Sequence, residues 1–138
     1  MRIMAIDYGD AHTGIAISDP TGFLAGFITV INAYRPEAVA EQISALAKEH
    51  GVEELVLGHP INMDGTRGPR SEKAQAMKTL LEETTSLPVV LWDERRTTID
   101  AHQILMNSGK NAKKRKKVVD AVAATLILEG YLTYKKTH

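Results

Sequence analysis

Cysteine is absent from the 138 residues of this chain. Its absence excludes disulfides, zinc–thiolate sites and cysteine nucleophiles, and it is consistent with a reducing compartment. Aromatic residues make up 5% of the chain, and they form no ladder on which single-stranded bases would stack. No apolar run approaches the roughly 20 residues of a membrane span, and the N-terminal run is too short for a signal peptide. We therefore expect neither a membrane span nor a cleaved signal peptide.

The chain also has no excess of either charge, since 17 lysines and arginines balance 17 acids at a formal net charge of zero. The composition thus gives no global signal for nucleic-acid binding. Locally, cations crowd one short segment with no acid between them. Such a run is typical of a solvated loop, and it also suits contact with a nucleic-acid backbone. Its members are Lys110, Lys113, Lys114, Arg115, Lys116 and Lys117.

The apolar runs and the residues that interrupt them predict an α/β fold in the order β-β-β-α-β-α-β-α-α. Hairpins make antiparallel pairs and helical crossovers make parallel ones, so we expect a five-stranded mixed sheet with helices on both faces. Pro36 is expected to open the first helix, and Ser71 to cap the second. The expected strands are 1–7, 15–17, 23–31, 54–58 and 88–92, and the last two helices are 97–109 and 118–132.

Asp7 is the most unusual residue of the first hairpin. The apolar run before it ends abruptly on its carboxylate, and Gly9 and Gly14 follow. A carboxylate at the end of a buried strand is costly unless a donor or a metal pairs with it. Asp7 therefore either accepts hydrogen bonds from the glycine turn or takes part in a metal site.

Other acids occupy comparable positions. Asp93 and Glu94 end the strand at 88–92, and Asp120 lies near the start of a last helix that is apolar on nearly all sides and should be largely buried. Ligands of open α/β sheets bind outside the strand ends. If the last helix packs across that edge, three carboxylates meet there, and a divalent cation would relieve their repulsion. An all-oxygen site favours Mg²⁺ or Mn²⁺, which hold phosphate and activate water.

Each of these acids also has a structural explanation when taken alone. Asp120 could be a helix N-cap, and Glu94 could pair with Arg95 or Arg96 at the surface. The three positions together favour a metal site, but the spacing does not decide between Asp93 and Glu94.

The segment 59–70 leaves the same edge of the sheet. Its glycines let backbone amides approach an anion, and Arg67 or Arg70 could hold a phosphate. The alternative is an Asp-Gly turn with solvent-facing arginines. Thr97 and Thr98 offer a second anion site or simply cap the helix that follows them.

Four separate motifs, in this order along the chain, resemble those of the YqgF family. The resemblance covers essentially the whole chain. The matching motifs are Asp7-Tyr-Gly9 with Gly14-Ile-Ala-Ile-Ser-Asp19; Gly58-His-Pro60 with Met63-Asp-Gly-Thr66 and Gly68; Asp93-Glu-Arg95 with Thr97-Thr98-Ile-Asp-Ala101; and Lys116-Lys-Val-Val-Asp120 with Ala123-Ala124 and Ile127-Leu128.

The resemblance implies a ribonuclease H-like fold with strand order 3-2-1-4-5, as a single nuclease domain over residues 1–138. Members of the family carry the names pre-16S rRNA nuclease and Holliday junction resolvase. The resemblance thus implies a bacterial cytoplasmic hydrolase that acts in 5′-end processing of pre-16S rRNA during ribosome biogenesis. Branched DNA is the alternative substrate, and a monomer or weak homodimer is expected.

By the same resemblance, Asp7, Glu94 and Asp120 take the three acidic catalytic positions and would hold two Mg²⁺ or Mn²⁺ ions. Asp93 would replace or assist Glu94. One departure is that the turn after Asp7 contains Asp10 and His12, where many relatives carry a basic residue, which weakens a phosphate-binding role for this turn. Cations elsewhere are expected to hold the nucleic-acid backbone: Arg67, Arg70, Arg95, Lys113, Lys114, Arg115 and Lys116.

Two other functions fit parts of the pattern. The zero net charge suits a ribosome-assembly factor that binds nucleic acid without cleaving it. Sugar kinases and actin-like proteins also open with Asp-x-Gly and a hairpin, which would suit an ATP-using phosphotransferase. Those folds need two such domains, and a chain of this length has room for one.

Overall fold

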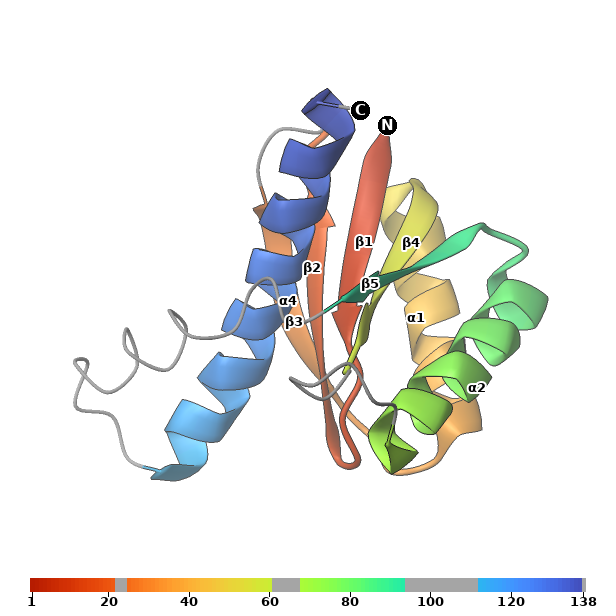
Figure 1. The fold of residues 1–138 in the computed structure, drawn as a ribbon, viewed down its shortest axis with the longest axis vertical. Helices are drawn as coiled ribbons and strands as arrows, with labels where there is room; N and C mark the ends of the chain where they lie inside the picture. The colour runs from red at the N-terminus through yellow and green to blue at the C-terminus, as the bar shows by residue number, and fades with distance from the viewer. Residues whose placement is uncertain (22–24, 61–67, 94–111, 138) are drawn as a thin grey trace.

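The computed structural model describes residues 1–21, 25–60, 68–93 and 112–137, and the helix expected at 97–109 lies outside them. Figure 1 shows a central sheet with helices on both sides. In chain order the elements are β1 (Arg2–Asp7), β2 (His12–Ser18), β3 (Ala25–Asn32), α1 (Pro36–His50), β4 (Val52–His59), α2 (Pro69–Thr85), β5 (Val89–Asp93) and α4 (Ala112–Thr137).

The sheet has five strands in the order β3-β2-β1-β4-β5. The two hairpin pairs, β1–β2 and β2–β3, are antiparallel, and the pairs β1–β4 and β4–β5 are parallel. This arrangement confirms the predicted mixed sheet and its strand order. Because β1 lies at the centre, its residues from Ile3 to Ile6 are buried on both faces.

Proline and glycine set the limits of α1. Pro36 occupies the first turn, where its missing N–H costs nothing, as expected from the sequence. The helix ends on Gly51 at φ 67°, a left-handed conformation that glycine adopts without strain.

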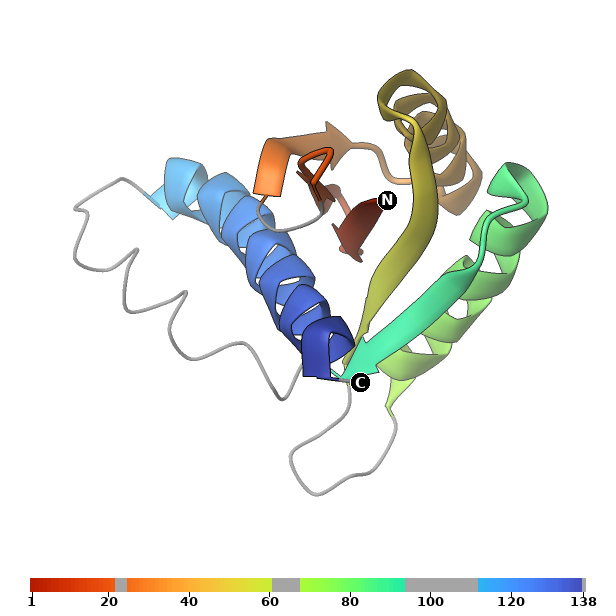
Figure 2. The same cartoon turned by 90° about the horizontal axis from the view of Figure 1, so that it is seen from above.

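Two apolar clusters form on opposite faces of the sheet because side chains alternate along each strand. Met4 and Ile6 of β1 face α1 and α2. Ile3 and Ala5 belong to the other cluster, under α4. The view from above in Figure 2 shows the same layers, with α4 on one side of the sheet and α1 and α2 on the other.

The expected cap at Ser71 is wrong. Helix α2 begins at Pro69, with Gly68 as its N-cap. Ser71 lies in the first turn, is fully buried, and its Oγ is 2.6 Å from Nε2 of His59. The physical reason is that Ser71 shares a helix face with Ala74 and Met77, and this face is turned towards the sheet.

The last helix is longer than expected. It begins at Ala112, so the cationic segment 113–117 is helical, and its interpretation as a loop is wrong. Lysine and arginine are good helix formers, and no glycine or proline interrupts the segment. In the part of α4 whose side chains are described, burial is confined to one face instead of extending nearly all round. The buried residues are Ala124, Ile127, Leu128, Tyr131 and Leu132.

Candidate active site at the carboxyl edge of the sheet

Asp7 is the last residue of β1, as expected. It pairs with Gly14 of β2 and lies one residue beyond the pair that Ile6 makes with Leu57 of β4. Its side chain is partly buried. Since Ile3 and Ala5 lie under α4, strand alternation places Asp7 on the α4 face as well.

Asp93 reaches the same edge of the sheet but on the other face. It is the register partner of His59, and Leu91, two residues before it, packs against the cluster under α1 and α2. His59 is 6% exposed and contacts Ser71 of α2. Asp93 is therefore on the α2 face, opposite to Asp7, and Glu94 lies outside the described residues.

Position 120 lies within α4, well after its first residue, Ala112. Asp120 is therefore not a helix N-cap, and that structural explanation is wrong. The position precedes the fully buried Ala124 by one helical turn, so it shares the helix face that packs on the sheet.

The direction of α4 brings position 120 level with Asp7. The Tyr131 hydroxyl donates to Oε1 of Glu54, which is the register partner of Ile3 in β1. From position 131 back to 120 the helix rises about 16 Å, and from Ile3 to Asp7 the strand advances about 13 Å. Figure 1 shows that α4 starts at the end of the sheet to which β1 points. Both positions thus lie at one edge and on one face.

Of the three predicted catalytic acids, Asp7 is the one whose side chain is described. Among the side chains that the structure describes, no three from histidine, aspartate and glutamate form a group that could hold a metal. The described part contributes two partly buried carboxylates at this edge, Asp7 on the α4 face and Asp93 on the α2 face. A carboxylate is a hard oxygen donor of the kind Mg²⁺ prefers.

The predicted phosphate-binding residues are spread over several elements. Arg70 is exposed in the first turn of α2. Lys113, Lys114, Arg115 and Lys116 occupy the first turns of α4, at the same end of the sheet as Asp7. Arg67 and Arg95, together with Thr97 and Thr98, lie outside the described residues.

Sequence reasoning missed two features next to this edge. Tyr8, directly after Asp7, is partly buried, and burial raises the pKa of its hydroxyl above the ordinary value. Lys73 of α2 forms an ion pair with Asp10, with Nζ 3.1 Å from Oδ1. Helical spacing does place Lys73 one turn after Arg70, but nothing in the sequence joins it to Asp10.

The five-stranded mixed sheet in the order β3-β2-β1-β4-β5, with helices on both faces, is a ribonuclease H-like fold. The chain shares this fold with RuvC of T. thermophilus, solved with a Holliday junction substrate, at a TM-score of 0.64 and 14% identity over 99% of this chain and 96% of RuvC. It also shares it with the Fowlpox virus resolvase, solved with Holliday junction DNA, at a TM-score of 0.59 and 13% identity over 98% and 99% of the two chains.

The chain belongs to the RuvX family, described as Holliday junction resolvase, whose model matches residues 1–134. This confirms the resemblance to the YqgF family. A relative from Halothermothrix orenii, named "Putative pre-16S rRNA nuclease", is 45% identical over 135 residues, which cover 98% of this chain and 96% of that protein. No helix in the described part of the chain has the length and hydropathy that a membrane span requires.

Proposed function

We propose that this protein is a divalent-metal-dependent nuclease that hydrolyses phosphodiester bonds in the 5′-end processing of pre-16S rRNA, in the bacterial cytoplasm. The course of α4 supports the proposal: from the contact of Tyr131 with Glu54 the helix runs towards the carboxyl edge, which would bring position 120 to about the level of Asp7. Membership of the RuvX family and the name of the relative from Halothermothrix orenii support the substrate class.

The proposed catalytic set is Asp7, Glu94 and Asp120. Asp93 is the weaker candidate, because strand alternation puts it on the α2 face together with His59, whereas Asp7 belongs to the α4 face. Carboxylates at these three positions would supply an all-oxygen donor set for two Mg²⁺ or Mn²⁺ ions. When bound, such ions activate a water molecule and stabilise the leaving oxygen in phosphodiester hydrolysis.

The chain's own residues would bind and orient the substrate. The scissile phosphate would lie against Asp7, with the cations of the first turns of α4 on one side and Arg70 of α2 on the other. Arg67 and Arg95 belong to the same proposed set. Cations on both sides of the carboxylates would compensate the repulsion between the acids and the phosphate backbone.

Resolution of branched DNA is the second candidate, and the description of the RuvX family favours it. The two functions differ in the substrate that binds, not in the proposed chemistry. A comparison of an RNA with a 5′ extension of the 16S sequence and a four-way DNA junction, under the same conditions, distinguishes them.

The test is cleavage of both substrates by the wild type and by Asp7→Asn with Mg²⁺ or Mn²⁺. Removal of a metal-binding carboxylate should lower the rate by more than about a hundredfold, since even an outer-shell partner of a metal can be worth that much. Asp19→Asn is the matched control. Asp19 follows β2 at the opposite end of the sheet, and its Oδ1 accepts a hydrogen bond from Thr21.

Two results would contradict the proposal. Equal cleavage by the wild type and Asp7→Asn would mean that a contaminating nuclease is at work. Tight binding of RNA without cleavage under either metal would instead support an assembly factor that lacks catalysis.

A further inference from the structure

Two neighbouring cavities lie where β1 ends, on the α2 face of the sheet, and Tyr8 lines both. The first, of about 240 Å³, is enclosed by the turn between β1 and β2, the end of β4 and the start of α2. The second, of about 390 Å³, lies between the start of α1 and the middle of α2. Tyr8, Asp10 and Lys73 line both cavities, so the two form adjacent compartments of one cleft along the first half of α2.

The first compartment has cationic groups on its α2 wall. Arg70 and Lys73 are neighbours on one helix face and both line it. Lys73 is held by Asp10, but the two side chains are 60% and 88% exposed. A pair exposed to this extent contributes little stability, so a phosphate can replace the carboxylate as the partner of Lys73. Guanidinium and ammonium groups together suit a phosphate.

The second compartment is mostly apolar, with one exposed ring at its rim. Met77 and Leu80 of α2 form part of its wall, and Glu37 is its acid on the α1 side. Tyr34 also lines it and is 81% exposed, more than any other large hydrophobic side chain in the described residues. An exposed ring beside an apolar wall is suited to stacking with a nucleobase, and Glu37 would keep the phosphate in the cationic compartment.

We propose that this cleft binds one nucleotide of a single-stranded nucleic acid, with the phosphate on Arg70 and Lys73 and the base on Tyr34. A base held in a duplex is stacked and paired, so it cannot enter the apolar compartment. Asp7 and Tyr8 are consecutive and point to opposite faces of the sheet. A strand that crosses the edge therefore contacts Asp7 with one phosphate and the cleft with a nearby nucleotide.

The inference deepens the proposed function, because it makes an unpaired segment beside the cleavage point part of the substrate. The balance of charge in the cleft supports it. Two cations and Asp10 line the first compartment, and replacement of Asp10 by a neutral residue would release Lys73 entirely for phosphate.

The experiment measures binding of a four-nucleotide single-stranded RNA by calorimetry in EDTA, so that cleavage plays no part. Tyr34→Ala should weaken binding about tenfold, within the range of one base stack, and Tyr34→Phe should restore it. Lys73→Gln should lower the slope of log K against log salt by about 0.7, as expected for one phosphate contact of a single strand. Asp10→Asn should tighten binding.

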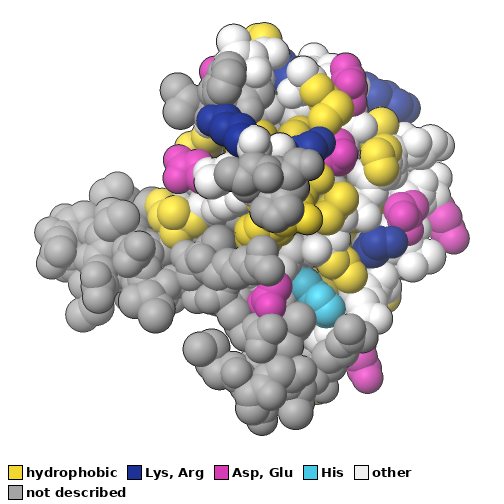
Figure 3. All heavy atoms as spheres, turned by 45° about the horizontal axis from the view of Figure 1, so that its top comes forward, with side chains coloured by type: hydrophobic (Ala, Val, Ile, Leu, Met, Phe, Trp, Pro, Cys, Tyr) yellow, Lys and Arg dark blue, Asp and Glu magenta, His cyan; other side chains and the backbone are white. Residues whose placement is uncertain are grey.

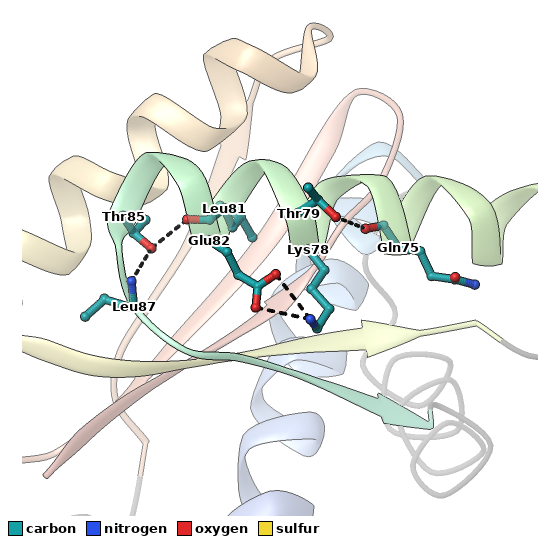
Figure 4. A network of polar contacts seen from close by, with 7 residues as sticks. All are labelled: Gln75, Lys78, Thr79, Leu81, Glu82, Thr85 and Leu87. Atoms are coloured by element: carbon teal, nitrogen blue, oxygen red, sulfur yellow. Dashed lines mark hydrogen bonds and ion pairs between the residues drawn. The ribbon is translucent and has the colours of Figure 1, made fainter.

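Lys78→Gln is the matched control. Lys78 forms the same kind of ion pair, with Nζ 3.1 Å from Glu82, further along α2 and outside the cleft (Figure 4). The Lys78→Gln variant should leave the affinity for the tetranucleotide unchanged. Tyr34, Lys73 and Lys78 lie at the surface, so these variants should fold, and their melting temperatures verify this.

Three outcomes would overturn the proposal. They are wild-type affinity of both Tyr34→Ala and Lys73→Gln, equal affinity for a longer and stable blunt duplex that has no unpaired nucleotide, or an equal loss of affinity in Lys78→Gln. Asp7→Asn separates this proposal from the nuclease proposal, because in EDTA the loss of one carboxylate near a phosphate should not weaken binding of the tetranucleotide, whereas it should abolish cleavage when metal is present. If Asp7→Asn still cleaves while binding depends on Tyr34, only the nuclease proposal fails. If Asp7→Asn is inactive while Tyr34→Ala binds normally, only the cleft proposal fails.

Discussion

At the scale of single residues, Tyr131 joins the last helix to the sheet. Its hydroxyl donates to Oε1 of Glu54 over 2.5 Å, and Nζ of Lys135 lies 3.4 Å from the same oxygen. The ring of Tyr131 meets Trp92 of β5 edge-on, with centroids 5.8 Å apart. This group of contacts sets the level at which α4 crosses β1, and hence the level of position 120.

Tyr131→Phe should change how stability depends on pH. Burial and, next, the hydrogen bond to Glu54 raise the pKa of Tyr131 far above its ordinary value of 10.0. The folded state therefore holds the phenol proton more tightly than the unfolded chain, so this contribution is complete below about pH 10 and is lost as the pH rises further. The melting temperature of the wild type should thus fall more steeply than that of Tyr131→Phe above about pH 10.

At neutral pH the same substitution should cost about 1.5–3 kcal/mol, the contribution of a hydrogen bond to a charged acceptor. Tyr34→Phe, at a ring that is 81% exposed, is the control and should keep the wild-type pH dependence. If the melting temperatures of the wild type and Tyr131→Phe fell equally with pH above about pH 10, the proposed contribution of the Tyr131 proton to stability would be wrong.

At the scale of elements, most of the fold could be predicted because local signals and tertiary packing agree. The apolar run of β1 and the Pro36 and Gly51 limits of α1 each identify their element without help from the rest of the chain. The start of α4 could not be predicted, because consecutive cations carry no apolar periodicity, although they favour a helix. The prediction that Ser71 caps α2 is wrong because the partner of its hydroxyl, His59, comes from another element.

The site was predictable in its location but not in its details. Strand ends converge at one edge in any such sheet, so Asp7 and Asp93 were expected there. The choice between Asp93 and Glu94 as the partner of Asp7 depends on which face of the sheet α4 covers. Tertiary packing decides which face this is. Alternation along β5, with Trp92 in the cluster under α4, separates Asp93 from Asp7 once this face is known.

Ala124→Leu tests whether the close contact of α4 with the sheet supports catalysis. Ala124 is fully buried in the cluster that contains Ala5 and Ala16, and it lies one turn from position 120. A larger side chain would push α4 away from the sheet at a cost of about 1–3 kcal/mol. It should also lower the rate of cleavage, because Asp120 would move relative to Asp7.

Ala123→Leu is the control, since Ala123 is partly exposed on the same turn of the helix. Its stability, measured by urea unfolding, and its cleavage rate should stay close to those of the wild type. Equal cleavage by Ala124→Leu and Ala123→Leu, despite a lower stability of the former, would contradict a catalytic role for the position of α4.

At the scale of the whole molecule, charge is balanced in number but not in place. The formal net charge is zero, yet the first turns of α4 carry consecutive cations at the end of the sheet where Asp7 lies. Figure 3 tips the opposite end towards the viewer, and there the described lysines, arginines and carboxylates are interspersed. The positive potential that attracts a polyanion should therefore be local to the carboxyl edge.

Two double variants test this distribution at equal net charge. Lys113→Gln with Lys114→Gln removes two cations near the candidate site, and Lys48→Gln with Lys136→Gln removes two exposed cations at the opposite end of the sheet, in the last turns of α1 and α4. For single-stranded RNA, measured in EDTA at a series of KCl concentrations, the first pair should lower the slope of log K against log salt by about 1.4, since each phosphate contact contributes about 0.7. The second pair should leave the slope as in the wild type, because those cations do not meet the backbone. If both pairs changed the slope equally, only the net charge would matter, and the proposed path of the substrate along the start of α4 would be wrong.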